Sequence, residues 1–532
     1  MKKSVTVFLI FSFFIVPLVK GQELSIPSGT GRYEALGFNP FMVDPAFDLN
    51  RNPSYGYMYR NYVFGDIGRA DNSEPNIYKL RNQYIGVNFG LGKSVYLGFI
   101  VNKNEGRMFD SVFYVNKPWG MGSLGMEMPV VPVKAFVGIA PTEKFSLAIS
   151  GYFARKSADS SKPFLNIQQL DTTNQGIGNW FEYFRHTQIG NSMEYKSSVI
   201  GVNLGTLGRF KDGYVEATID FKFNNYSYKN NYDTVLTTRY HRWAQPPQLS
   251  DSTSTVNVRS ISLSVENDGM MEFNGFTRAF ITANRENQIY VVPYFQIGFF
   301  SWKPKYTPTD SKNDTLPKRP YINTITHDYD YSYFNLQTGV GINMPVFEKG
   351  LLACGLSFGY NSFKVTSTDI DTRFTGNGIA PGSNDTVKTT STTTENFKYS
   401  RIQFPKLNLG LEWSFTSWLT GRIGYSRSLL SDKVDYSNQT TITQVQISAV
   451  PTFNNRVLSS VINDNSTNVY SALLPSDPIQ TISLGLGFHF DRFSIDGMIG
   501  EKFFQKGPNI LSGQDDKELF GVLSASYNFN FK

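Results

Sequence analysis

Short stretches in which apolar and polar residues alternate recur along the whole chain, and they come in pairs. Within a pair, the two stretches are joined by a few residues, as at Gly92-Lys93-Ser94 and Lys211-Asp212-Gly213. Alternation predicts strands with one apolar and one polar face. Long stretches rich in Asn, Asp, Ser and Thr separate the pairs, at roughly 65–82, 103–133, 157–196, 229–270, 303–328, 368–396, 430–478 and 502–518. We expect these to be loops, so the two ends of the sheet should differ.

The final stretch, Leu519–Lys532, alternates in the same way and is rich in aromatic residues. Its apolar side carries Leu519, Leu523, Ala525, Tyr527, Phe529 and Phe531, and its polar side carries Ser524, Ser526, Asn528 and Asn530. A soluble β-sandwich could end on such a strand, but transmembrane barrels close on one, with short periplasmic turns and long extracellular loops. We therefore predict an all-β fold, a transmembrane antiparallel β-barrel of 14–16 strands. Leu519–Lys532 would be the part that the barrel-assembly machinery binds.

Counting from a first strand at Tyr55–Phe64 gives sixteen strands, provided that Val256–Val265 lies in an external loop. If the weaker strands are left out, the count is fourteen.

The N-terminus is typical of a secretory signal peptide. A basic start is followed by the apolar run Val7–Val19 and then by Lys20-Gly21-Gln22. These features predict a signal peptide at 1–21. Residues 22–54 contain several glycines and X-Pro steps, which argue against a regular element. We expect 22–54 to be a periplasmic or plug segment and 55–532 to be the barrel, in the outer membrane of a Gram-negative bacterium and in contact with its lipid.

Two strands indicate which side chains face the lumen. Along Tyr214–Asn224, one face is apolar and the other carries Glu216, Asp220 and Lys222. Charge costs about 2–4 kcal/mol on a lipid-facing strand for a basic residue, so the charged face should point inward. The strand at Ile479–Phe490 places His489 on the inner side by the same reasoning.

A cross-strand ion pair is expected next to the turn Thr416-Ser417-Trp418. If Phe415 faces Leu419 across this turn, Glu412 faces Arg422 on the inner side. The pair could shape the field along a pore or rigidify the wall.

Composition excludes several classes of function. The single cysteine, Cys354, excludes an intrachain disulfide. The formal charge of +6 falls to about +3 once the three lysines of the signal peptide are removed, so we expect no nucleic-acid partner. The four histidines show no metal-ligand spacing and no phosphate loop is present, so we predict no metal, no cofactor and no enzyme activity. A Ser/His pair assembled across the wall remains an open alternative.

Tyrosine and aspartate alternate between Tyr321 and Tyr333. This tract could hold a cation or stack a sugar. The favoured interpretation is an aromatic girdle that reaches into a polar loop.

The segment Phe41–Tyr55 resembles the start of the FadL-like outer-membrane transporter family. That family carries an acidic pair and then Asn-Pro-Ala before the first strand; here Asp44 stands at the acidic position, and Asn52-Pro53-Ser54 follows. Pro45 replaces the second acid, and Ser54 replaces alanine. The resemblance implies that Asp44, Asn52 and Pro53 belong to a plug in the lumen and that small hydrophobic molecules pass through the barrel.

Diffusive uptake of a small, hydrophobic solute is therefore the predicted function. Three alternatives stay open: a general porin for polar solutes, a binding or scaffold barrel in a surface or secretion complex, and a secreted soluble β-protein.

Overall fold

The structure of the chain is a computed structural model that describes residues 31–69, 84–103, 131–174, 180–243, 249–313, 321–347, 349–376, 386–447, 458–462, 468–474, 478–499 and 520–529. The predicted signal peptide, residues 22–30 of the predicted plug, Leu519 and residues 530–532 lie outside the described residues.

Three short helices precede the strands: α2 (Gly31–Ala35), α3 (Pro45–Arg51) and the 3-10 helix η1 (Pro53–Tyr57). No helix among the described residues is long and apolar enough to cross a membrane. The strands are β1 (Tyr62–Arg69), β2 (Ile85–Leu91), β3 (Val95–Lys103), β4 (Val131–Thr142), β5 (Phe145–Asn174), β6 (Trp180–Phe210), β7 (Gly213–Trp243), β8 (Leu249–Asn284), β9 (Ile289–Asn313), β10 (Tyr321–Val346), β11 (Gly350–Gly376), β12 (Thr386–Ser414), β13 (Leu419–Ile447), β14 (Leu458–Ile462), β15 (Asn468–Leu474), β16 (Ile479–Phe490), β17 (Phe493–Ile499) and β18 (Phe520–Asn528).

The strands form one closed antiparallel barrel. The first strand, β1, pairs with both β2 and the last strand, β18, which closes the sheet on itself. β14, β15 and β16 all pair with β13, at successive levels along it, so these three segments share one position in the wall. The eighteen segments among the described residues therefore occupy sixteen positions. This confirms the predicted barrel at its upper strand count.

Alternation along each strand separates the two faces of the wall. On β7, Val215, Ile219 and Phe223 are exposed by 40–52%, whereas Glu216 and Lys222 are buried. The apolar side chains thus cover the outside of the barrel, and the charged ones point inward.

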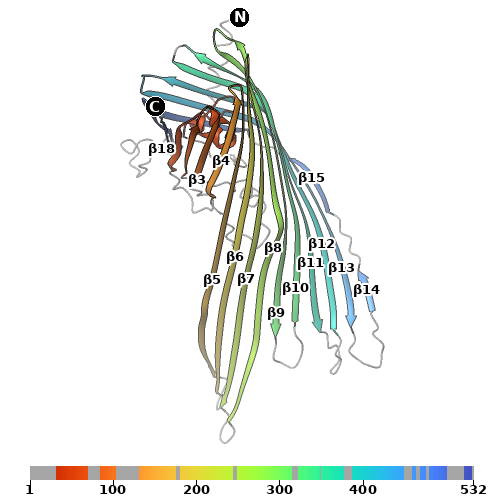
Figure 1. The fold of residues 1–532 in the computed structure, drawn as a ribbon. Coiled ribbons are helices and arrows are strands. Elements are labelled where there is room, and N and C mark those ends of the chain that lie inside the picture. The colour runs from red at the N-terminus through yellow and green to blue at the C-terminus, as the bar shows by residue number, and fades with distance from the viewer. Residues whose placement is uncertain are drawn as a thin grey trace, which may run out of the picture.

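Five of the polar stretches that were expected as loops, at 157–196, 229–270, 303–328, 368–396 and 430–478, are strand through most of the residues that the structure describes there. The stretches at 65–82, 103–133 and 502–518 lie mostly or wholly outside the described residues. β5 to β13 are 25 to 36 residues long, and Figure 1 shows them as a tall curved wall that continues far beyond the short strands. At about 3.3 Å per residue, a strand of thirty residues spans roughly 100 Å, several times the apolar height of a barrel. Val256–Val265, expected in an external loop, lies within β8. Threonine favours strands, so stretches such as Thr389–Thr394 pair across β12 and β13 although both faces are polar.

The first strand begins later than expected. Tyr55 was placed at the start of a strand, but it lies in η1 and β1 begins at Tyr62. Pro53 explains the difference, because its fixed φ and missing N–H suit the first position of a helix.

Candidate functional site

The residues Gly31–Tyr57, which we call the N-terminal segment, lie inside the barrel. The backbone N–H of Gly31 donates to Ser524 Oγ on β18 at 3.0 Å. Asn39 Nδ2 donates to a carbonyl oxygen of β11 at 3.1 Å. Asn88 Nδ2 on β2 donates to the carbonyl oxygen of Gly56 at 2.8 Å. Because the segment contacts strands on every side of the wall, it spans the interior near the tight-turn end.

Two capping residues shape the segment. Asp44 is the N-cap of α3, and its carboxylate accepts from the N–H of Phe47 at 2.8 Å. Asn52 caps η1, where its Oδ1 accepts from the N–H of Ser54 at 3.1 Å and Pro53 occupies the first turn. The amide of Asn52 also donates to the carbonyl oxygen of Thr206 on β6 at 3.1 Å. The Asn-Pro-Ser motif therefore caps a helix and joins that helix to the wall.

Arg278 on β8 is the centre of the first anchor. Its side chain is fully buried, and its Nε donates to Glu216 Oε1 on β7 at 2.6 Å. Its Nη2 donates to Asp48 Oδ1 in α3 at 3.0 Å. Arg51 donates to the same two carboxylates, at 2.6 Å to Asp48 and 3.1 Å to Glu216. Two cations and two carboxylates thus compensate each other where the segment meets the wall.

Further contacts fix the same anchor. Arg278 Nη1 donates to the carbonyl oxygens of Pro40 and Met42, at 3.0 and 2.6 Å. The guanidinium of Arg51 lies 3.7 Å from the ring centroid of Phe276. Burial raises the pKa of Asp48 above the ordinary carboxyl value, and the charges of Arg278 and Arg51 oppose that shift.

Arg32 forms the second anchor, on another part of the wall. Its Nε donates to Glu412 Oε2 on β12 at 2.9 Å, and its Nη1 lies 3.4 Å from Asp44 Oδ2. Arg422 on β13 donates to the same Glu412 oxygen at 2.7 Å and forms an ion pair with Asp496 on β17 at 2.8 Å. Burial lowers the pKa of Arg32, but Glu412 and Asp44 raise it by more, so Arg32 stays charged.

Substitution of Arg32 by glutamine should loosen one end of the segment only. We expect a cysteine at Ala35 to be labelled by a water-soluble thiol reagent faster than in the parent. The anchor at Arg278 still holds α3 against the wall, so a cysteine at Ala46 should be labelled at the parent rate. The variants would be made in a Cys354→Ala background. Equal acceleration at both positions would contradict two separate anchors.

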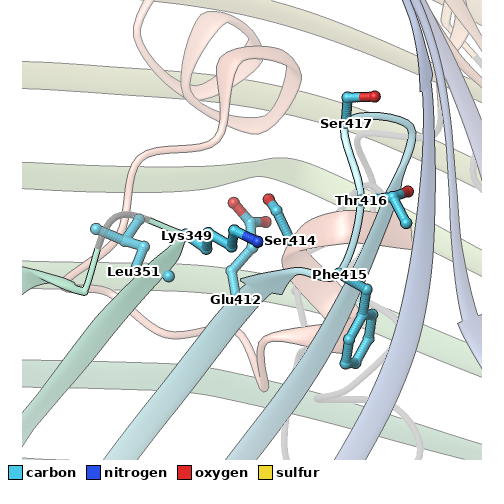
Figure 2. A pocket seen from close by; sticks show the side chains of 8 residues that line it. Lys349, Leu351, Glu412, Ser414, Phe415, Thr416 and Ser417 are labelled. Carbon is cyan, nitrogen blue, oxygen red and sulfur yellow. The ribbon is translucent and has the colours of Figure 1, made fainter.

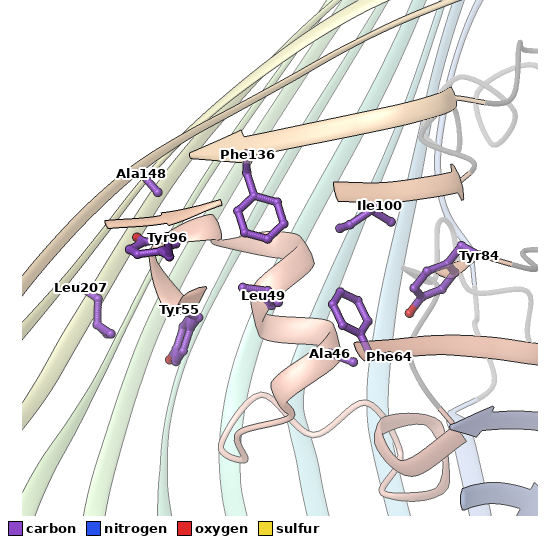
Figure 3. Packing of buried hydrophobic residues seen from close by; sticks show 10 residues of the cluster. All are labelled: Ala46, Leu49, Tyr55, Phe64, Tyr84, Tyr96, Ile100, Phe136, Ala148 and Leu207. Atoms are coloured by element: carbon purple, nitrogen blue, oxygen red, sulfur yellow. The ribbon is translucent and has the colours of Figure 1, made fainter. Parts of the chain in front are cut away.

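Apolar packing supports both anchors. Figure 3 shows Leu49 and Tyr55 of the segment among rings from the wall, including Phe64, Tyr96 and Phe136, all of which are buried. On another part of the wall, Phe41 is fully buried in a second cluster. It lies against Gly341 and Gly355, where an added Cβ would meet its ring. These two glycines leave room for the phenyl ring.

The other predicted lumen residues lie on the inner face but belong to different groups. Lys222 Nζ lies 3.1 Å from Glu272 Oε1 and 3.7 Å from Asp220 Oδ2, farther along the strands from the tight turns than Glu216. His489 shares a hydrogen bond of 3.0 Å with Ser494 Oγ on β17.

A pocket of about 410 Å³ opens at the tight-turn end, between the β10–β11 and β12–β13 turns. In Figure 2 the side chains of Lys349, Glu412 and Ser414 point toward one another. Because Glu412 also binds Arg32, this pocket reaches the second anchor.

Sequence reasoning identified Arg422 but missed the other cations of the two anchors. Arg32, Arg51 and Arg278 were not singled out, although Arg278 is a charged residue on the inner face of a strand, the signal that had identified Glu216. The charged groups of the two anchors pair with one another, so they hold the N-terminal segment against the wall. Among the described residues, no group of three or more His, Cys, Asp or Glu side chains is placed to hold a metal ion.

The comparisons with known proteins add little to this description. No protein-family model matches the chain, and no curated protein matches it. Four solved chains match. One is a mutant of the ferric enterobactin receptor (PfeA) from Pseudomonas aeruginosa, which is 8% identical with a TM-score of 0.20, over 88% of this chain and 80% of that chain. The assignment as a barrel rests on the strand pairing described above.

Proposed function

We propose that the chain is an outer-membrane transporter that takes up small, hydrophobic molecules by diffusion and that the N-terminal segment plugs its lumen. The observation that carries this proposal is the position of the segment, which crosses the interior and is tied to the wall by two ionic anchors. An open pore has no need of such a segment, whereas a gated transporter does.

The outer surface supports a place in a membrane. Large apolar side chains are exposed along the strands, as at Leu147, Ile149 and Phe153 on β5. Exposed aromatic residues gather at the tight turns, namely Phe145, Phe210, Phe347, Phe415, Trp418 and Phe490. Aromatic girdles at the two interfaces flank the apolar band of outer-membrane barrels.

The preference for hydrophobic solutes follows from the resemblance of Phe41–Tyr55 to FadL-like transporters. The segment that carries this resemblance contains Asp44 and Asn52, which cap its two helices, and Pro53, which begins the second.

A binding or scaffold role is the second candidate, and one observation favours it. The tall wall of β5 to β13 offers a large polar surface outside the membrane, more than a diffusive channel requires. Solute flux without any bound partner would argue against this role.

The test is single-channel conductance of the purified, detergent-folded protein in a planar bilayer, beside a variant that lacks Glu23–Pro53. We expect a closed parent and a conducting variant. The deletion leaves Arg278 paired with Glu216, and Glu412 paired with Arg422, so each of these buried groups of the wall keeps a partner of opposite charge. Heat-modifiable electrophoretic mobility checks that both barrels are folded. A steady conductance of the same size in both proteins would replace the plug with a general porin.

A further inference from the structure

Two rows of aromatic side chains line the inside of the wall, farther from the tight turns than the N-terminal segment. In one row the register pairs Phe300 with Tyr333 and Tyr333 with Phe363. In the next, Trp302 pairs with Tyr331, and their rings are stacked with centroids 5.2 Å apart. These five side chains are at most 5% exposed and pack as one cluster.

These rows correct the interpretation of the Tyr321–Tyr333 tract as a girdle. Tyr331 and Tyr333 lie on the inner face, whereas Asp330 lies on the other face, 3.1 Å from Lys303. Tyr331 and Tyr333 therefore do not anchor the barrel in lipid. They supply rings to the interior.

The rows continue onto β12, where they become accessible. The register pairs Phe363 with Tyr399, and Phe397 is the next inward residue on the same strand. Both are only partly buried. A solute inside the lumen can therefore reach the rings of Phe397 and Tyr399.

A row of polar side chains, which we call the amide row because four of its five members are asparagines, lies directly beside the aromatic rows, on the side of the tight turns. It runs from Asn203 through the carboxylate of Asp220 to Asn274 across β6, β7 and β8, and Asn335 and Asn361 continue it on β10 and β11. Tyr333 donates to Asn361 Oδ1 at 3.3 Å, which joins the two kinds of row.

Two amide oxygens in this region have unused hydrogen-bonding capacity. Among the described residues, Oδ1 of Asn335 and Oδ1 of Asn224 accept no hydrogen bond, although each residue is 5% exposed. A buried amide oxygen without a donor costs about 1–3 kcal/mol. A ligand with hydroxyl groups would supply the missing donors.

The charges beside the rings do not suit an anion. Lys222 lies between two carboxylates, Glu272 and Asp220, which leaves an excess of one negative charge. Farther round the wall, Arg401 donates from Nε and Nη2 to the two carboxylate oxygens of Asp432, each at 2.8 Å. Neither cation has a charge to spare for a solute.

We infer that the lumen binds uncharged, ring-bearing solutes that carry hydroxyl groups, of the aryl glycoside type, and that it discriminates against their anionic counterparts. The rings stack on the aromatic rows, and the hydroxyl groups donate to the amide row. For the route by which the solute arrives, this inference rests on the proposed function. Binding of the solute in the lumen does not depend on that function.

Two probes that differ in one carboxylate test the inference, namely phenyl β-glucoside and phenyl β-glucuronide. Isothermal titration calorimetry on the purified full chain measures binding, and swelling of liposomes that contain the protein measures flux. We expect the glucuronide to bind at least about tenfold more weakly, because its carboxylate faces uncompensated negative charge in a low-dielectric site. The double variant Asp220→Asn, Glu272→Gln should remove this difference, since Lys222 then becomes available.

A second pair of variants tests the rings. Phe397→Ala should weaken glucoside binding about threefold to tenfold, the value of one aromatic contact, whereas Phe299→Ala on the outer face should leave it unchanged. Heat-modifiable mobility confirms that each variant is folded. Equal binding of the two probes by the parent, or no effect of Phe397→Ala, would overturn the inference. Tight glucoside binding without flux, even after deletion of Glu23–Pro53, would overturn transport and leave the inference standing.

Discussion

Replacement of Arg278 by methionine should free the N-terminal segment from the barrel wall. The side chain of Arg278 is fully buried and binds Asp48, Glu216 and two backbone carbonyl oxygens. Methionine fills much of the same space but leaves Arg51 alone to compensate two buried carboxylates. Removal of one partner from such a network costs about 3–5 kcal/mol. The cost falls mainly on the docked state of the segment, because Asp48 leaves the interior when the segment does.

The rate of thiol labelling at a buried position of the segment measures this release. Ala46 is 4% exposed, so a cysteine there is protected while the segment is docked. In a Cys354→Ala background, Arg278→Met should raise the labelling rate by about a hundredfold or more, the equivalent of 3 kcal/mol. Arg285→Met is the matched control, because Arg285 lies at the end of the same strand in an exposed pair with Asp212.

Two further outcomes decide what the network does. The double variant Arg278→Met, Asp48→Asn removes the excess carboxylate, leaves Arg51 paired with Glu216 and should recover part of the protection. If Arg278→Met leaves labelling unchanged, apolar packing alone holds the segment and the ionic anchor has no measurable role.

The substitution Gly341→Val should displace the N-terminal segment by steric overlap. An added Cβ at Gly341 would lie 2.5 Å from Cγ of Phe41, well inside contact distance. Valine favours strands, so the wall itself should tolerate the change. Phe41 cannot stay in place, and we expect the planar-bilayer conductance to approach that of the deletion variant. An overpacked core costs about 1–3 kcal/mol.

A compensating substitution makes this prediction specific. Phe41→Ala combined with Gly341→Val reopens space for the new side chain and should restore a closed channel. Gly151→Val is the control, because a Cβ at Gly151 meets only ordinary van der Waals distances. If the Gly341→Val variant does not conduct, the packing of Phe41 against Gly341 is not needed to hold the segment.

The sixteen strand positions could be predicted from the sequence because the part of each strand next to a tight turn alternates between apolar and polar residues. The pairing of Glu412 with Arg422 could be predicted as well, since the length of one turn sets the register of its hairpin. These are local features, and local features are readable in a sequence.

The height of the wall could not be predicted, for a physical reason. Both faces of the tall strands are polar far from the tight turns, so stretches such as Thr389–Thr394 lose the period of two that marks a strand. Asn, Ser and Thr then suggest loops. The anchors were missed because they join parts of the chain that are far apart, such as Asp48 and Arg278, which are separated by 230 residues.

The seam between β1 and β18 closes a circuit that includes the N-terminal segment. The last strand completes the wall, and the segment inside it contacts that strand across 493 residues, from Gly31 to Ser524. The length of this circuit is a small obstacle, because each doubling of a loop costs only about 0.6 kcal/mol. The segment bonds to β18 at the seam and to β2, which pairs with β1, so docking of the segment and closure of the cylinder stabilise each other.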